Sequence, residues 1–188
     1  MLKTKIAVFV SGGGTNFEAL INAQENGKIP HGEIVLMVSS SKTAYALKRA
    51  ENHGIKSVVC SKKELGSQES FEKEILKNLE ENNIQLIVLA GFMSILSKEF
   101  TKKYENRIIN IHPSLIPSFC GEGFYGLHVH EAALKKGVKV TGATVHIVNE
   151  IPDGGPIIMQ RAVYVEENDT PEILQKLSLI HISEPTRH

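Results

Sequence analysis

Four short runs rich in apolar residues, separated by stretches with helical spacing, constrain the fold of this chain most. The runs cover residues 5–10, 33–38, 57–59 and 85–90, and the helical stretches between them begin near Phe17, Ala44 and Gln68. A continuous apolar run is typical of a strand that is buried on both faces of a parallel sheet. Because strands and helices alternate, the sequence predicts an α/β fold with a Rossmann-like, doubly wound and mostly parallel sheet.

The alternation changes in the last third of the chain. Residues 139–148 and 157–165 are both β-rich, and no helical pattern separates them. They flank residues 149–156, a loop dense in turn-forming residues. We therefore expect these two strands to pair antiparallel at the C-terminal end of the sheet.

The last predicted helix begins with Thr170 as its cap and Pro171 at its first position. Its amphipathic pattern breaks after Leu177. We therefore expect one domain over residues 1–177, followed by a non-native or disordered tail over residues 178–188.

The composition excludes several classes of protein. Lys and Arg number 21, as do Asp and Glu, so there is no charge excess that would indicate a nucleic-acid or membrane partner. Two cysteines are too few for a disulfide scaffold. No apolar run approaches the roughly 20 residues that span a bilayer, and no signal peptide is recognisable. The expected location is cytoplasmic.

Residues 110–117 (Asn-Ile-His-Pro-Ser-Leu-Ile-Pro) follow a short β-branched run and form the first candidate site. Pro113 cannot donate to a sheet ladder, so the strand should stop near His112. Alternation along the strand places Asn110 and His112 on one face at its carboxyl end, where ligands bind in open α/β sheets. By themselves these residues are equally compatible with an ordinary hydrogen-bonded turn.

A second candidate site is the glycine loop at residues 11–16 (Ser-Gly-Gly-Gly-Thr-Asn), between the first strand and the first helix. Thr15 or Asn16 can cap that helix, and the free N–H groups of the loop suit a phosphate. The loop matches neither G-x-G-x-x-G nor a P-loop, so a monophosphate is the better prediction. The alternative is that the glycines only permit a tight turn.

Residues 91–96 (Gly-Phe-Met-Ser-Ile-Leu) leave the fourth predicted strand at its carboxyl end. Exposed apolar residues at this position can line a pocket for a flat aromatic ligand. Ordinary packing of a loop on a helix is an equally good interpretation of the same residues.

Asp153, in the loop between the last two strands, completes a set suited to acyl transfer onto an amine. Asn110 would stabilise the oxyanion, His112 would move protons, and Asp153 would orient and charge the imidazole. No Ser or Cys stands in a nucleophile elbow, which favours direct transfer over a covalent intermediate. No His and Cys cluster has zinc spacing, so we expect no metal.

Four segments in register closely resemble the folate-dependent formyltransferases. They are residues 11–16, 89–93, 110–117 and 142–156, within a resemblance that covers residues 6–177. The resemblance implies the formyltransferase fold and N10-formyltetrahydrofolate as co-substrate. It further implies the amine of glycinamide ribonucleotide as the acceptor.

The resemblance also implies residue roles. Asn110, His112 and Asp153 match the catalytic residues of the family, and Gly14, Thr15 and Asn16 match its phosphate-binding segment. The folate site is implied to comprise Gln68, Met93, Ser94, Ile95, Leu96 and Asn110. Gln68 and Ser94 stand where relatives often carry arginine. The family also has a helix beyond Leu177 with an acidic residue that binds the ribose, and this residue has no counterpart here.

Other activities use parts of the same pattern. A formyltetrahydrofolate deformylase would use the same three residues with water as acceptor, but usually carries an N-terminal domain, for which there is no room before Lys5. A methionyl-tRNA formyltransferase would need a tRNA-binding domain and a basic surface. A catalytically silent nucleotide-binding module is the alternative from another class. We expect small-molecule substrates, no nucleic acid, no membrane, and a monomer or homodimer.

Overall fold

The computed structural model describes residues 2–183. Its contacts divide the chain into unit 1, which ends at Ile109, and unit 2, which begins at Asn110. The seven strands follow the order β3-β2-β1-β4-β5-β6-β7. The predicted mostly parallel α/β sheet with an antiparallel C-terminal pair is therefore confirmed.

Unit 1 alternates strands with helices, as the apolar runs predict. Its elements are β1 (Thr4–Val10), α1 (Thr15–Glu25), β2 (Gly32–Ser39), α2 (Ala46–Asn52), β3 (Lys56–Val59), α3 (Lys62–Leu65), α4 (Gln68–Glu81), β4 (Leu86–Leu89) and α5 (Lys98–Lys103). β1 pairs in parallel with β2 and β4, and β2 pairs in parallel with β3. Sequence reasoning missed α3 and α5, because helices of 4 and 6 residues are too short to show a 3.6-residue period.

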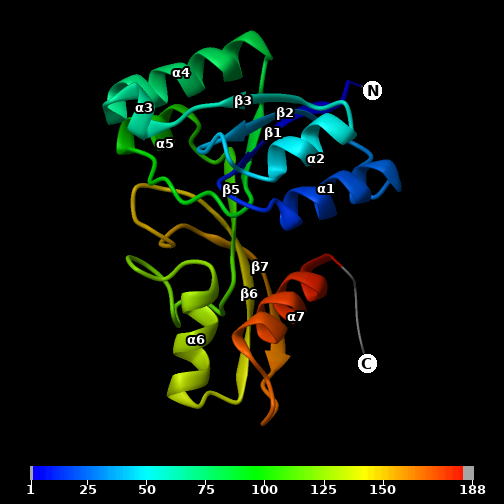
Figure 1. The fold of residues 1–188 in the computed structure, drawn as a ribbon, viewed down its shortest axis with the longest axis vertical. Helices are drawn as coiled ribbons and strands as arrows, with labels where there is room; N and C mark the ends of the chain where they lie inside the picture. The colour runs from blue at the N-terminus through cyan, green and yellow to red at the C-terminus, as the bar shows by residue number, and fades with distance from the viewer. Residues whose placement is uncertain (1, 184–188) are drawn as a thin grey trace. The chain divides into compact units, whose positions relative to one another are not determined.

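Alternate residues of β1 supply the core on both faces of the sheet. On one face, a buried cluster joins β1 to α1 and α2 and includes Ile6, Val8, Val10, Phe17, Ile21, Ala46 and Ala50. Phe9 packs instead against the rings of Phe92 and Phe100, with centroids 5.1 and 6.5 Å away. Figure 1 shows α1 and α2 on one side of these strands and α4 on the other, so unit 1 is doubly wound.

β5 (Ile108–His112) leads into unit 2, which continues with α6 (Leu127–Lys136), β6 (Val140–Ile147), β7 (Ile157–Tyr164) and α7 (Pro171–Ser183). β6 and β7 pair antiparallel, from Val140 opposite Tyr164 to His146 opposite Ile157, as the sequence predicts. α7 packs against α6, β6 and β7 (Figure 1). No helix within residues 2–183 is long and apolar enough to cross a membrane.

The predicted end of the last helix, near Leu177, is wrong, because α7 continues to Ser183. Leu174 and Ser178 are both fully buried and stand four residues apart, so they share one helix face. A serine at a buried position interrupts the apolar pattern without ending the helix. Residues 184–188 of the predicted tail lie outside the described residues, and the non-native origin of the tail stays a prediction.

Candidate active site

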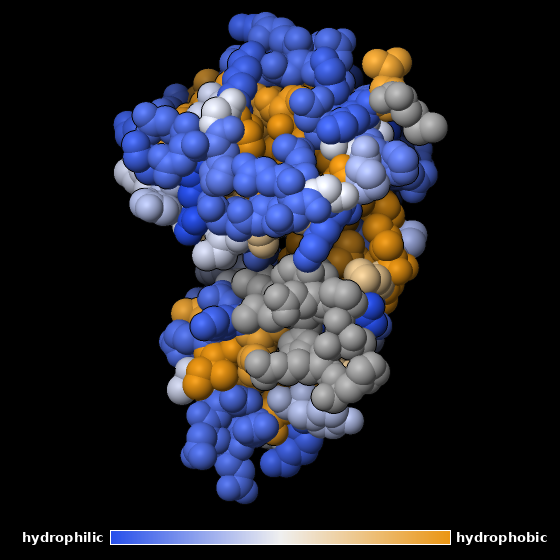
Figure 2. Space-filling view, turned by 90° about the vertical axis from the view of Figure 1, so that its right-hand side faces the viewer, coloured by the Kyte–Doolittle hydropathy of each residue, from blue (hydrophilic) through white to orange (hydrophobic). Residues whose placement is uncertain are grey.

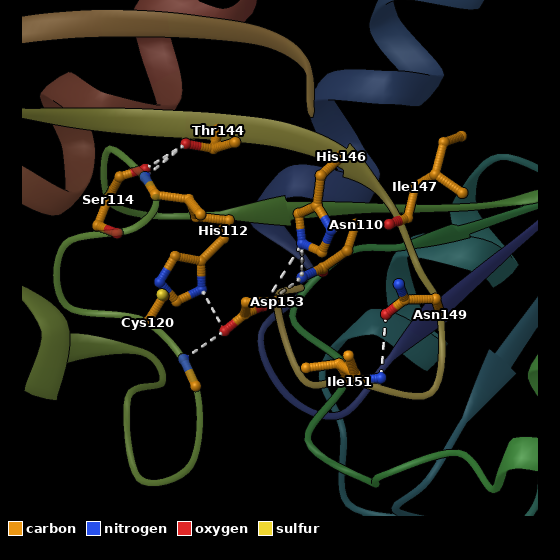
Figure 3. Close-up of polar contacts among 12 residues, drawn as sticks. Asn110, His112, Ser114, Cys120, Thr144, His146, Ile147, Asn149, Ile151 and Asp153 are labelled. Carbon is orange, nitrogen blue, oxygen red and sulfur yellow. Dashed lines mark hydrogen bonds and ion pairs between the residues drawn. The ribbon is translucent and has the colours of Figure 1, made fainter. Parts of the chain in front are cut away.

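β5 presents Asn110 and His112 at its carboxyl end, immediately before Pro113. The strand ends at His112, as the missing N–H of the proline predicts. His112 is buried and Asn110 is partly buried. The two side chains point toward a common region in Figure 3.

A tight turn in the loop between β6 and β7 supplies Asp153. The N–H of Gly154 donates to the carbonyl of Ile151 at 2.9 Å, with Pro152 and Asp153 as the central residues. Asp153 has a φ of 53°, which resembles the third position of a type II turn and which Asp tolerates better than most residues. A Cβ on Gly155 would collide with the backbone carbonyl of Ile147, so glycine is required for this loop to lie against β6.

The imidazole of His112 lies between two hydrogen-bond acceptors. Its Nδ1 is 3.4 Å from Oδ2 of Asp153, and its Nε2 is 2.8 Å from the carbonyl oxygen of Phe119. Neither a carboxylate nor a carbonyl can donate a hydrogen bond. The arrangement therefore suits an imidazolium that donates from both nitrogens, with Asp153 as its counter-ion (Figure 3).

His146 of β6 forms the other side of this cluster. Its Nδ1 lies 3.0 Å from the carbonyl oxygen of Ile147, and its Nε2 lies 3.2 Å from Nδ2 of Asn110 and 3.4 Å from Oδ1 of Asp153. A neutral His146 accepts a hydrogen bond from Asn110 at Nε2, whereas a protonated His146 donates to Asp153. The Asn110 amide also donates to Asp153 at 3.5 Å.

The surroundings of Asp153 favour its ionised form. Burial acts to raise its pKa, but the hydrogen bonds from His146 and from the backbone N–H of Gly121, together with the nearby imidazoles, outweigh burial. The pKa of Asp153 therefore lies below its ordinary value. The Gly121 contact measures 2.9 Å and ties the loop after β5 to the same carboxylate.

The loop after β5 is also fixed to β6. The hydroxyl of Thr144 donates to the carbonyl of Ser114 at 2.6 Å and accepts from the N–H of Ile116 at 3.1 Å. Thr144 is fully buried. It thereby holds the loop that follows His112 at a defined distance from the strand that carries His146.

Unit 1 holds the glycine loop at the start of α1. Gly14 is the N-cap residue, with a φ of 73° and no side-chain cap, so the prediction that Thr15 or Asn16 caps this helix is wrong. Both residues lie in the first helical turn instead. Among the described residues, the N–H groups of Gly13, Gly14 and Thr15 donate to no acceptor. A helix start with several free donors is a site for an anion.

A family model described as formyl transferase matches residues 4–179. The chain belongs to the formyl transferase family. Trifunctional purine biosynthetic protein adenosine-3 of Gallus gallus is 47% identical over 174 residues, which are 93% of this chain and 17% of that protein. The chloroplastic phosphoribosylglycinamide formyltransferase of Arabidopsis thaliana is 38% identical over 93% of this chain and 60% of its own length.

A solved structure with the same fold is the phosphoribosylglycinamide formyltransferase of Bacillus halodurans, at 40% identity and a TM-score of 0.88. The match covers 96% of this chain and 90% of that chain. The two curated relatives are longer: the chain spans 17% of the first and 60% of the second.

The segment that the resemblance assigns to folate leaves β4 in unit 1. Met93 and Ile95 are exposed, as expected for residues that meet a ligand. The N–H of Met93 donates to Oγ of Ser11 at 2.8 Å, so this segment lies beside the beginning of the glycine loop. Ser94 and Leu96 are partly buried.

Gln68 of α4 anchors that segment. Its amide nitrogen donates to the carbonyl of Ile95 at 3.0 Å and to Oε1 of Glu72 at 2.5 Å. Glu72 is buried and also accepts from the backbone N–H and the hydroxyl of Ser97, both at 2.6 Å. Both amide hydrogens of Gln68 are thus engaged within the protein, and its oxygen is the atom left for a ligand.

Sequence reasoning brought together Asn110, His112 and Asp153 but missed His146. The only local signal for His146 was its alternation with Thr144 on one face of β6. Its partners lie far along the chain, so no spacing pattern reveals them. Within residues 2–183, no group of three or more His, Cys, Asp or Glu side chains has the arrangement of a metal site.

Proposed function

We propose that this formyl transferase transfers the formyl group of N10-formyltetrahydrofolate to the amine of glycinamide ribonucleotide, a step of de novo purine biosynthesis. The arrangement of Asn110, His112 and Asp153 in one hydrogen-bonded cluster carries the proposal. The relatives that bear the name phosphoribosylglycinamide formyltransferase support the choice of acceptor.

The proposed reaction is a direct transfer. The amine attacks the formyl carbon, and negative charge grows on the formyl oxygen. The amide of Asn110 stabilises this charge by exchanging its long contact with Asp153 for the oxyanion, and a protonated His112 stabilises it through its positive charge. The carbon–nitrogen bond to the folate then breaks. A proton leaves the attacking nitrogen and reaches the departing folate nitrogen, with His112 as the group that moves it.

The chemistry of the cysteine beside the cluster supports direct transfer. Burial and the charge of Asp153 raise the pKa of Cys120, so its thiol stays protonated and is a poor nucleophile. Its Sγ donates to the carbonyl of Pro117 at 3.3 Å. We therefore propose no acyl-enzyme.

The remaining predicted roles are part of the same proposal. Gly14, Thr15 and Asn16 bind the phosphate of the nucleotide, and the folate is bound by Gln68, Met93, Ser94, Ile95, Leu96 and Asn110. We propose that the enzyme works in the cytoplasm on small molecules alone, without a metal, nucleic acid or membrane, as a monomer or homodimer.

Initial rates with N10-formyltetrahydrofolate test the proposal, measured with and without glycinamide ribonucleotide. We expect rapid tetrahydrofolate formation that depends on the nucleotide and yields one formylated nucleotide per folate. Equal tetrahydrofolate formation without the nucleotide, with release of formate, would identify a deformylase instead. No turnover with either acceptor would favour a silent binding module.

A further inference from the structure

The glycine loop of unit 1 packs against α2. The carbonyl of Gly12 accepts the N–H of Ala46 at 3.2 Å, and the carbonyl of Gly13 accepts Nε–H of Arg49 at 2.9 Å. A Cβ on Gly14 would lie 2.7 Å from the Cβ of Ala46. The loop is therefore held on α2 by two hydrogen bonds to its backbone, and it lies so close to α2 that Gly14 has no room for a side chain.

The bond from Arg49 determines where a free donor points. In a trans peptide, the carbonyl of Gly13 and the N–H of Gly14 lie in one plane and point in opposite directions. Because Arg49 holds that carbonyl, it directs the Gly14 N–H away from Arg49. That N–H is one of the donors at the start of α1 for which the described residues offer no acceptor.

Two acidic residues and a histidine fix Arg49 in turn. Nη1 of Arg49 is 3.0 Å from Oε2 of Glu18, and Nε2 of His53 is 3.1 Å from the other oxygen of that carboxylate. Nδ1 of His53 is 2.9 Å from Glu25. The guanidinium also lies 5.2 Å from the ring centroid of Tyr45, so it is restrained on several sides.

Glu18 keeps its charge in this network. Burial acts to raise its pKa, but Arg49 and His53 outweigh burial, and the pKa of Glu18 lies below its ordinary value. The side chains of Arg49 and Glu18 are 24% and 28% exposed, so the pair is partly shielded from solvent. The face of unit 1 that is visible in Figure 2 is mostly hydrophilic.

We propose that Arg49 is a positioning residue of the phosphate site: it holds the Gly13 carbonyl so that the Gly14 N–H faces the nucleotide phosphate, and Glu18 holds its guanidinium in place. This inference rests on the proposed function, which supplies the nucleotide as ligand. In this inference Arg49 acts through the loop: its Nε–H is donated to the Gly13 carbonyl, and its Nη1 lies against Glu18.

The kinetic test uses Arg49→Gln and Glu18→Gln in the full chain. For Arg49→Gln we expect the KM for glycinamide ribonucleotide to rise about tenfold, while kcat changes less than about twofold, as for a lost ground-state interaction. The KM for the folate should not change. Inhibition by inorganic phosphate should weaken in parallel. Arg49→Lys should give an intermediate KM, because one ammonium cannot replace the fork of a guanidinium.

Glu18→Gln separates positioning from direct contact and also covers the possibility that Arg49→Gln does not fold. If Arg49 positions the loop, Glu18→Gln should raise the KM for the nucleotide as well, although by less. A lower KM in Glu18→Gln would mean that the freed guanidinium binds phosphate directly, which would overturn the inference.

Arg107→Gln is the matched control, since Arg107 also lies over a tyrosine ring of unit 1, 4.8 Å from the centroid of Tyr104. It should behave as wild type. Suppose that wild type formylates the nucleotide. If Arg49→Gln and Glu18→Gln then show the wild-type KM for the nucleotide and the wild-type inhibition by phosphate, Arg49 is only structural. A wild type that does not formylate the nucleotide would refute the proposed function itself.

Discussion

Oδ2 of Asp153 lies 3.4 Å from Nδ1 of His112, at the point where the turn between β6 and β7 meets the end of β5. His112 also has the carbonyl of Phe119 at its second nitrogen, so the carboxylate is the only one of its two partners that carries charge. In the proposed mechanism, Asp153 therefore acts on the charge of the imidazole and does not contact the reacting carbon.

Replacing Asp153 by Asn should keep the shape of this contact and remove its charge. We expect kcat to fall by about a hundredfold, because the imidazolium loses its counter-ion and faces an amide. Asn149→Ala, which alters the same loop through the contact with the N–H of Ile151, is the control and should change kcat much less. An unchanged kcat in Asp153→Asn would mean that Asp153 is only a turn residue.

Asn110→Ala and His112→Ala test the other two members of the cluster. Each should lower kcat by about a hundredfold or more, which is typical for loss of an oxyanion donor or a general acid. Because both act in one step, the double variant should lose much less than the product of the two single losses. Strict multiplication of the two effects would show that they act independently.

His146 marks the limit of what the sequence could predict in this cluster. Strand alternation and the position of Pro113 were sufficient to place Asn110 and His112 together, and the turn chemistry around Asp153 was readable as well. The contact between His146 and Asn110 joins residues 36 positions apart, so it depends on the pairing of whole strands and leaves no local pattern.

The helix termini show a second limit. The apolar period predicted a helix that begins near Gln68, and α4 begins there, with Phe71, Ile75 and Leu79 fully buried. The cap of α1 was predicted from side-chain chemistry, whereas the structure uses the left-handed backbone of Gly14. In α7, the buried Ser178 lies on the buried face of the helix, although a pattern of apolar residues predicts that the helix ends before it.

Gly14 should not tolerate a side chain, for two reasons: its backbone conformation and its close contact with α2. Its φ of 73° favours glycine, and an added Cβ would press on Ala46 and not enter the space of the anion. We expect Gly14→Ala to raise the KM for glycinamide ribonucleotide by about an order of magnitude through displacement of the loop. Gly12→Ala, with no atom within 4 Å of its added Cβ, is the control and should have a much smaller effect. Equal KM values for the two variants would place the phosphate elsewhere.

His130 of α6 should make the protein less stable at acidic pH. It is fully buried, neither ring nitrogen has a hydrogen-bond partner among the described residues, and burial, with a smaller effect of His112, lowers its pKa to about 4. Below the ordinary value of 6.5, the unfolded chain binds a proton that the folded chain refuses. Stability contributed by the neutral ring is therefore lost as the pH falls from about 6.5 toward about 4.

His130→Leu removes this titration. We compare the free energy of unfolding of His130→Leu with that of wild type at two pH values. The advantage of the variant over wild type should be about 2 kcal/mol larger at about pH 5 than at about pH 8. Denaturant unfolding at the two pH values measures the difference. His128→Leu, an exposed histidine of the same helix, is the control. The same difference at both pH values would show that His130 does not titrate as described.

A single-turnover experiment tests the central claim most directly, namely direct formyl transfer by the cluster of Asn110, His112 and Asp153. Enzyme in excess is mixed with N10-formyltetrahydrofolate labelled in the formyl carbon and with glycinamide ribonucleotide, and both donor and product are followed after rapid quenching. We predict that the label leaves the folate and appears on the nucleotide with one rate constant, which Asn110→Ala and Asp153→Asn lower equally for both species. Label that leaves the folate before it reaches the nucleotide, whether held on the protein or released as formate, would contradict the account.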